Sequence, residues 1–143
     1  MTSSPAILDQ RLYTATVTST GGRDGRAKSD DGTLDLAISP PGGNKPGTNP
    51  EQLFAAGYSA CFGGAIGAVS RAQKIQPGNF TVTAKVTLGK VGEGFGIAAD
   101  IEVSLPDLPR DKAEALVAAA HQVCPYSKAT RGNIEVNVKV ADH

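Results

Sequence analysis

Several segments of the chain alternate hydrophobic and polar residues with a period of two, which is typical of strands with one buried face. The clearest example is 80–88, FTVTAKVTL, in which every second residue is apolar. After a glycine-rich turn at 92–96, residues 97–105 alternate in the same way, so the two segments predict a hairpin. Further strands are predicted at 12–20, 26–29, 33–39 and 134–140.

Two other segments have the spacing of helices. The first helix is predicted to begin at Pro50, because proline suits the first helical position, and to run to about Lys74. The second is predicted within 106–124, where small and aliphatic residues recur with the 3.6 period. Pro125 disfavours helical geometry at the residue before it, so Cys124 is expected at the end of this helix.

The order of these elements predicts the fold class. Three strands, a helix, two strands, a second helix and a last strand indicate an α+β domain with mainly antiparallel sheet. We expect residues 1–11 to be a disordered lead and residues 12–143 to form a single domain. The lead has neither the basic region nor the apolar region of a signal peptide, which favours a cytoplasmic location.

Charge and composition narrow the classes of function. The 143 residues include 14 Lys+Arg and 14 Asp+Glu, so the chain lacks the basic excess of proteins that bind nucleic acid or an anionic membrane surface. The uncharged run 53–70 approaches the length of a membrane span. Its glycines, alanines and serines favour a buried helix of a soluble protein instead.

Small residues recur every four positions along the first predicted helix. Such a row forms a ridge that lets another backbone approach closely. Two interpretations stay open at this point, close packing inside one subunit and a helix buried between two subunits. The row consists of Ala56, Ala60, Gly64, Ala68 and Ala72.

The chain has two cysteines, too few for a scaffold built on disulfides. Cys61 lies inside the first helix, where a buried cysteine is more often inert than nucleophilic. Cys124 lies at a helix C-terminus, whose partial negative charge disfavours a thiolate, so it is the poorer nucleophile and the better resolving thiol. His121 lies one turn before Cys124, which leaves a Cys–His hydrolase open, although a surface or interface position is favoured for it. These residues lack the spacing of a zinc site.

Three strings carry a resemblance to a known family. They are TGGRDGR at 20–26, NPEQLFAAGYSACF at 49–62 and AAAHQVCPYSKATRGNI at 118–134. Together they resemble the organic hydroperoxide resistance (Ohr) branch of the OsmC superfamily, over a match from Leu12 to Val140. The resemblance implies an intertwined homodimer with an α+β fold. In it, mainly antiparallel sheets pack around a long buried helix and a second helix, with active sites at the subunit interface.

The resemblance also implies a function, that of a thiol-dependent peroxidase which reduces organic hydroperoxides to alcohols. Cys61 corresponds to the peroxidatic cysteine, which is oxidised to a sulfenic acid, and Cys124 to the resolving cysteine, which closes a disulfide. Arg23 matches the arginine that stabilises the thiolate, and Glu51 matches the carboxylate that holds this arginine. A dithiol, dihydrolipoamide or a lipoylated protein, would reduce the disulfide. No metal, haem or flavin is implied.

The implied substrate pocket is apolar, which would favour organic hydroperoxides over hydrogen peroxide. Two positions depart from the family pattern, Lys128 where asparagine is expected and Gly63 where a larger apolar residue is usual. A peroxidase of the OsmC branch and a redox-sensing module are alternatives that use the same cysteine pair. The expected pocket lining is Leu53, Phe54, Phe62 and Phe95.

The spacing of Glu51 and Cys61 bears on how the site is assembled. Cys61 follows Glu51 by ten positions, which corresponds to roughly 15 Å along a helix. One arginine side chain reaches roughly half of that distance. We therefore expect Arg23 and Glu51 to serve the Cys61 of the other subunit, with a site inside one subunit as the alternative.

Overall fold

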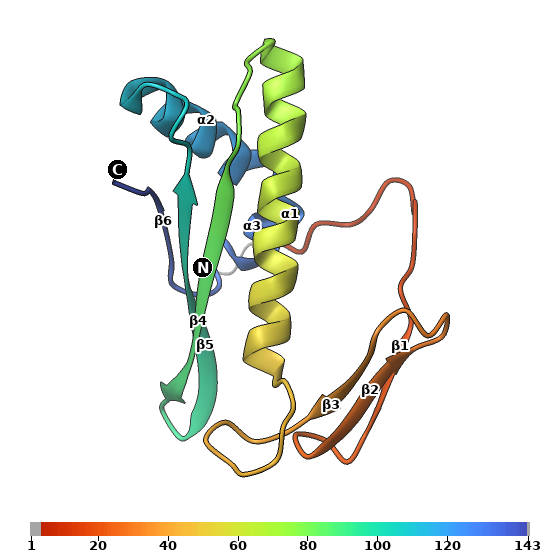
Figure 1. Cartoon of the computed structure of the whole chain (residues 1–143). Coiled ribbons are helices and arrows are strands. Elements are labelled where there is room, and N and C mark those ends of the chain that lie inside the picture. The colour runs from red at the N-terminus through yellow and green to blue at the C-terminus, as the bar shows by residue number, and fades with distance from the viewer. Residues whose placement is uncertain (1–3, 143) are drawn as a thin grey trace. The chain divides into compact units, whose positions relative to one another are not determined.

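The computed structural model describes residues 4–142 (Figure 1). The chain divides into two compact units, residues 1–49 and residues 50–143, and each contains one three-stranded sheet. The single domain predicted from residue 12 onward stays a prediction. Of the predicted lead, residues 1–3 lie outside the described residues, and residues 4–11 form neither helix nor strand.

The N-terminal unit is an antiparallel meander of short strands. The predicted strand 12–20 is formed only in its last four residues, because its partner strand ends at Ser29, opposite Val17. The first turn is closed by the N–H of Asp24, which donates to the carbonyl of Gly21 at 3.1 Å. The three strands are β1 (Val17–Thr20), β2 (Gly25–Ser29) and β3 (Asp35–Ile38).

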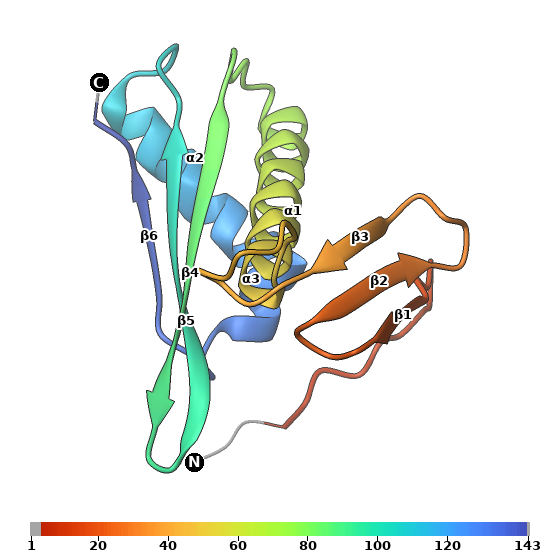
Figure 2. The same ribbon diagram turned by 60° about the horizontal axis from the view of Figure 1, so that its bottom comes forward.

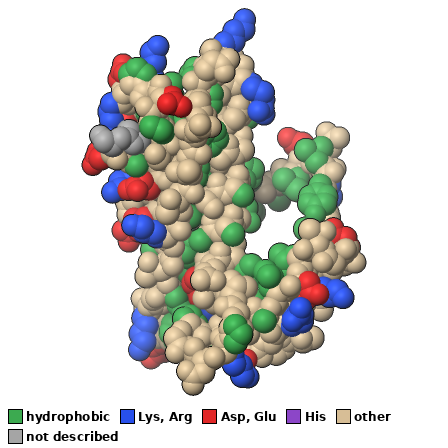
Figure 3. Space-filling view, in the orientation of Figure 1, with side chains coloured by type: hydrophobic (Ala, Val, Ile, Leu, Met, Phe, Trp, Pro, Cys, Tyr) green, Lys and Arg blue, Asp and Glu red, His purple; other side chains and the backbone are tan. Residues whose placement is uncertain are grey.

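The C-terminal unit begins with the long helix α1 (Pro50–Gln73), which starts at the predicted residue. It ends where Lys74 adopts a left-handed backbone (φ 57°), and the N–H of Ile75 then donates to the carbonyl of Ser70 at 2.9 Å. By length and composition α1 is apolar enough to cross a membrane, and 33% of its most apolar window is buried within the chain. Figure 3 shows hydrophobic and uncharged atoms along the middle of α1.

The sheet of this unit contains the predicted hairpin and the predicted last strand. β4 (Thr81–Val91) and β5 (Gly94–Ser104) are longer than expected, because Gly92 adopts a positive φ of 56° that allows a tight turn. β6 (Val136–Val140) pairs with β5 in parallel, whereas the other three strand pairs are antiparallel. The mainly antiparallel α+β fold is thus confirmed.

Two helices connect β5 to β6. The predicted second helix is α2 (Arg110–Val123), and it is followed by α3 (Pro125–Thr130), which the pattern did not predict. The helices cover one face of the sheet, with α1 packed along β4 and α2 against β6 (Figure 2). Charged residues lie on the other face, where Lys139 and Glu102 form an ion pair at 3.2 Å.

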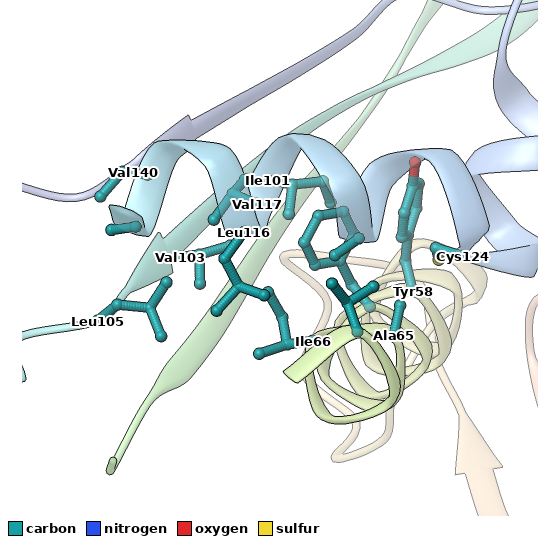
Figure 4. Close-up of a cluster of buried hydrophobic side chains, with 14 of the residues drawn as sticks. Tyr58, Ala65, Ile66, Ile101, Val103, Leu105, Leu116, Val117, Cys124 and Val140 are labelled. Carbon is teal, nitrogen blue, oxygen red and sulfur yellow. The ribbon is translucent and has the colours of Figure 1, made fainter. Parts of the chain in front are cut away.

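The hydrophobic core lies between the helices and this sheet (Figure 4). Alternate residues of β5 are buried there, as the period of two predicted. The apolar stripe predicted on the second helix is also confirmed, since all five of its residues are buried. They are Ala113, Leu116, Val117, Ala120 and Cys124.

Candidate functional site

The core brings together the two cysteines, which are far apart in the sequence. Cys61 lies on α1 and is partly buried, whereas Cys124 lies between α2 and α3 and has no exposed surface. Both are free thiols. The two thiols lie near one another, because Cys124 is among the groups that raise the pKa of Cys61. The fold therefore brings two free thiols from distant parts of the sequence into one region.

Cys124 lies at a corner between two helices, as the following proline predicted. Its backbone is extended (φ −65°, ψ 123°), and Pro125 is the first residue of α3. The N–H of Cys124 donates to the carbonyl of Ala120, and its carbonyl accepts from the N–H of Lys128, both at 2.9 Å. Both ends of this short corner are thereby held by helical hydrogen bonds.

The environment of Cys61 acts on its ionisation in two directions. Burial raises the pKa of the Cys61 thiol, because the thiolate loses hydration. The backbone N–H of Tyr126 donates a hydrogen bond that lowers this pKa, and the interaction with Cys124 raises it again. The net effect is a raised pKa, so a nucleophilic thiolate at neutral pH needs a further positive charge nearby.

Aromatic side chains pack beside the thiols. The ring of Tyr126 lies 5.8 Å from that of Phe54 and 5.6 Å from that of Tyr58, measured between centroids. Gly57 is required by this packing, because a Cβ atom at this position would lie 2.9 Å from Cζ of Tyr126. Gly57 of α1 thus leaves room for an aromatic side chain of the same subunit.

The four predicted pocket residues have different surroundings. Phe54 lines an apolar cavity of about 440 Å³ between α1, β5 and α3, together with Ile97 and Tyr126. Phe62 has no exposed surface and packs against His121, with the ring centroids 6.3 Å apart. Phe95 is 74% exposed near the end of the hairpin, and Leu53 is partly buried on α1. Of these four residues, Phe54 is the one found among the residues lining this cavity.

His121 lies partly below the surface, and its Nδ1 atom contacts a hydroxyl group and not a thiol. It is partly buried, and Nδ1 lies 2.7 Å from Oγ of Ser127. Burial lowers the pKa of His121, and the positive charge of Arg131 lowers it further. The imidazole is therefore neutral at neutral pH. This contact was not predicted, because Ser127 belongs to α3, which has no periodic signal of its own.

Arg23 and Glu51 lie in different units. Arg23 lies in the turn between β1 and β2, next to two glycines with positive φ, and Glu51 lies in the first turn of α1. Their meeting near a thiol stays a prediction. The two departures from the family pattern lie away from the thiol pair, since Lys128 is exposed and a Cβ atom at Gly63 would face Phe80 on the sheet side.

Among residues 4–142, no group of three or more His, Cys, Asp or Glu side chains is arranged to hold a metal ion. The residues that sequence reasoning missed are Gly57, Tyr58, Tyr126 and Ser127. Their contacts depend on α3 folding back onto α1.

Comparison with known proteins agrees with this geometry. Residues 42–139 match the family of OsmC-like proteins. An organic hydroperoxide resistance protein of Xanthomonas axonopodis pv. citri is 49% identical over 135 residues, which covers 91% of this chain and 95% of that protein. Organic hydroperoxide resistance protein OhrB of Bacillus subtilis is 50% identical over 134 residues, covering 90% and 98% respectively.

Solved structures give the same result at the level of the fold. The crystal structure of OhrB of Bacillus subtilis superposes with a TM-score of 0.87 at 48% sequence identity, over 92% of this chain and 100% of that one. At 92% of the chain, the likeness extends into both units. The chain belongs to the OsmC/Ohr family, in its organic hydroperoxide resistance branch.

Proposed function

We propose that the protein is a thiol-dependent peroxidase that reduces organic hydroperoxides to alcohols, with Cys61 as the peroxidatic and Cys124 as the resolving cysteine. The observation that carries the proposal is the proximity of two free thiols, Cys124 in the core and Cys61 packed against it. The names of its relatives support the coarser statement, a role in detoxifying peroxides.

The proposed cycle has three steps. The Cys61 thiolate attacks one peroxide oxygen, the O–O bond breaks, and the products are an alcohol and a Cys61 sulfenic acid. The Cys124 sulfur then attacks the Cys61 sulfur, and water leaves as the disulfide forms. A dithiol of the lipoyl type reduces this disulfide by thiol–disulfide exchange and is itself oxidised to a cyclic disulfide.

The first step needs a thiolate, which burial of Cys61 disfavours. A guanidinium is always charged and can both stabilise the thiolate and donate hydrogen bonds to the peroxide. We assign this role to Arg23 and assign Glu51 to hold it in position. The family resemblance supports both assignments, and the raised pKa of Cys61 is the physical reason why such a cation is required.

The proposed substrate class is supported by the apolar cavity beside Tyr126 and Phe54. An apolar wall of this kind favours an alkyl or aryl hydroperoxide over hydrogen peroxide, because it removes apolar surface of the substrate from water. Leu53, Phe62 and Phe95 stay predicted lining residues, and Phe62 can reach a substrate only if its core position changes.

We also propose a homodimer, with the protein in the cytoplasm. The apolar helix α1 leaves much of its surface uncovered within the chain, and Val91 and Phe95 are exposed on the hairpin. A second copy that covers these surfaces accounts for them without a membrane.

Turnover with defined reductants tests the proposal. The reduced protein should consume cumene hydroperoxide repeatedly with dihydrolipoamide and more slowly with thioredoxin. The Cys61→Ser variant, which keeps a side chain of similar size, is the matched control and should consume none. Stoichiometric oxidation without turnover would favour a redox sensor, and activity in the control would exclude Cys61 as the nucleophile.

A further inference from the structure

A buried network of hydroxyl groups and one imidazole connects the three helices of the C-terminal unit. The hydroxyl of Tyr58 on α1 lies 2.9 Å from Oγ of Ser127 and 3.2 Å from Oγ1 of Thr130, both on α3. Ser127 also contacts Nδ1 of His121 on α2 at 2.7 Å. Tyr58 and Ser127 have no exposed surface, and Thr130 is 4% exposed.

This network lies one helical turn from each thiol. Tyr58 precedes Cys61 by three residues on α1, and His121 precedes Cys124 by three residues at the end of α2. Residues three apart are neighbours on a helix surface. Figure 4 shows the hydroxyl oxygen of Tyr58 pointing away from α1, with Cys124 beside its ring. The hydrogen bonds therefore join the two backbone segments that carry the sulfur atoms.

The hydrogen bonds of the network fix the position of α3, which apolar packing alone does not do. α3 has only six residues, too few to be stable as an isolated helix. The side chains that it buries are the hydroxyls of Ser127 and Thr130 rather than aliphatic groups. A buried hydroxyl needs a partner at a defined distance and direction, so Tyr58 and His121 define where α3 and the preceding corner lie.

We propose that Tyr58, His121 and Ser127 are positioning residues for disulfide closure, holding the Cys124 sulfur against the oxidised Cys61. This inference rests on the proposed peroxidase function. The step concerned is attack of the Cys124 sulfur on the Cys61 sulfenic acid, in which the S–S bond forms, the S–O bond breaks and water leaves. The organic hydroperoxide already consumed is the oxidant, so no further reactant is required.

None of the three residues is assigned to the peroxide in the proposed cycle. The first step, oxidation of Cys61, is therefore insensitive to the network, and the second step is sensitive to it. When closure is slow, the sulfenic acid persists, and a second hydroperoxide oxidises it to the sulfinic acid. The network thus determines which fraction of the sulfenic acid forms the disulfide and which fraction is oxidised irreversibly.

The Tyr58→Phe variant tests this role. It removes the hydroxyl shared by Ser127 and Thr130 and keeps the ring, which packs against Phe54 and Tyr126. The reduced protein is mixed rapidly with cumene hydroperoxide, and sulfenic acid, disulfide and sulfinic acid at Cys61 are followed by quenching and mass spectrometry. We expect first-step rates within about twofold of the wild type and disulfide closure slower by roughly tenfold, because the buried hydrogen bonds of the Tyr58 hydroxyl are lost.

A second pair of variants gives an independent readout. His121→Leu removes the partner of Ser127, whereas His121→Asn keeps a hydrogen-bonding group near the position of Nδ1. Closure should slow in the leucine variant and recover in the asparagine variant. This pair decides the question if Tyr58→Phe does not fold.

Val103→Ala is the control for a general loss of stability, because Val103 is fully buried in the core and belongs to β5, outside the network. Closure at the wild-type rate in Tyr58→Phe, equal slowing of both steps, or equal slowing of closure in Val103→Ala would overturn the proposal. A wild-type protein that consumes no organic hydroperoxide would instead overturn the peroxidase function itself, so the two failures are distinguishable.

Discussion

The two units of the chain differ in how they hold their functional residues. The C-terminal unit has a core of fully buried apolar side chains, and both cysteines lie in or against it. Among the described residues of the N-terminal unit, the buried ones are Ala27, Ile38 and Ser39. A three-stranded sheet needs a covered hydrophobic face to be stable. The packed core of the C-terminal unit can therefore hold the two thiols in fixed positions. The position of Arg23, the proposed cation, depends instead on a turn and on the surface that covers the N-terminal sheet.

The largest expected effect comes from the thiols of the C-terminal unit. Cys61→Ser should abolish consumption of organic hydroperoxide. The one thiol that remains, Cys124, is buried and cannot attack the peroxide in its place. Cys124→Ser should still form a sulfenic acid that a trapping reagent captures, but only once per chain. Multiple turnovers by Cys124→Ser at the wild-type rate would exclude a resolving role for this residue.

Arg23 in the N-terminal unit should have the next largest effect. Arg23→Ala should slow the reaction of Cys61 by roughly 10- to 100-fold, the effect of losing a charged hydrogen bond. The rate of alkylation of Cys61 as a function of pH measures the cause, since the curve should move to higher pH. An unchanged curve would contradict the assignment of this cation.

A mixed dimer tests whether Arg23 of one chain and Cys61 of the other chain belong to the same active site. Chains with Cys61→Ser and chains with Arg23→Ala are refolded together, and each variant refolded alone is the control. If Arg23 serves the partner's thiol, one site of the mixed dimer carries both defects and the other is intact, so activity returns toward half of the wild type. A verified mixed dimer without recovery would return Arg23 to the Cys61 of its own chain.

Matched leucine substitutions should separate the stabilities of the units. Leu116→Ala removes a side chain that is 1% exposed and should lower the free energy of unfolding by roughly 2–5 kcal/mol. Leu36→Ala in β3, where the side chain is 39% exposed, should change it by no more than about 0.5 kcal/mol. Urea unfolding measures both values. Equal losses would mean that the N-terminal sheet is as well covered as the core.

Two glycines distinguish a packing constraint from a backbone constraint. Gly57→Ala brings a methyl group against the ring of Tyr126 and should lower stability by roughly 1–3 kcal/mol. Gly22→Ala meets no atom within 4 Å, but its φ of 58° is unfavourable for alanine by roughly 1–2 kcal/mol. Thermal unfolding compares them. A neutral Gly57→Ala would show that Tyr126 is free to move.

The smallest expected effect is the pH dependence due to His121. Burial lowers the pKa of this residue in the folded state, so the unfolded chain binds the proton more tightly. Its contribution to stability is fully present above the ordinary value of 6.5 and is lost as the pH falls through the lower folded value. The free energy of unfolding should therefore fall on acidification, and less steeply in His121→Asn. The same slope in both proteins would contradict this.

The periodic elements could be predicted from the sequence, because each has a local signal. The start of α1 at Pro50, the alternating hairpin and the buried stripe of α2 all follow from spacing within one segment. The tight turn at Gly92 and the start of β1 at Val17 depend on pairing between strands, which a single segment does not contain. Boundaries were therefore less well predicted than elements.

The site was predictable only in part for the same reason. The family resemblance pointed to Cys61 and Cys124, and the structure places these two thiols near one another. The supporting contacts of Tyr58 and Ser127 were missed, because α3 has only six residues and begins at Pro125, where the sequence predicts the end of the preceding helix. Whether Arg23 and Glu51 meet a thiol depends on the assembly of the units, which no local pattern encodes.

The most direct test of the account is the product formed when one equivalent of organic hydroperoxide reacts with the reduced protein. The proposed cycle should yield one equivalent of alcohol and a monomeric chain in which Cys61 and Cys124 are joined, identified by mass spectrometry of peptides under non-reducing conditions. A disulfide requires the two Cα atoms to lie within roughly 4.4–6.8 Å of each other, so its formation also tests how closely the fold holds α1 and the α2–α3 corner. A covalent dimer as the main product, or an oxidised Cys61 beside a Cys124 that remains a free thiol, would contradict it.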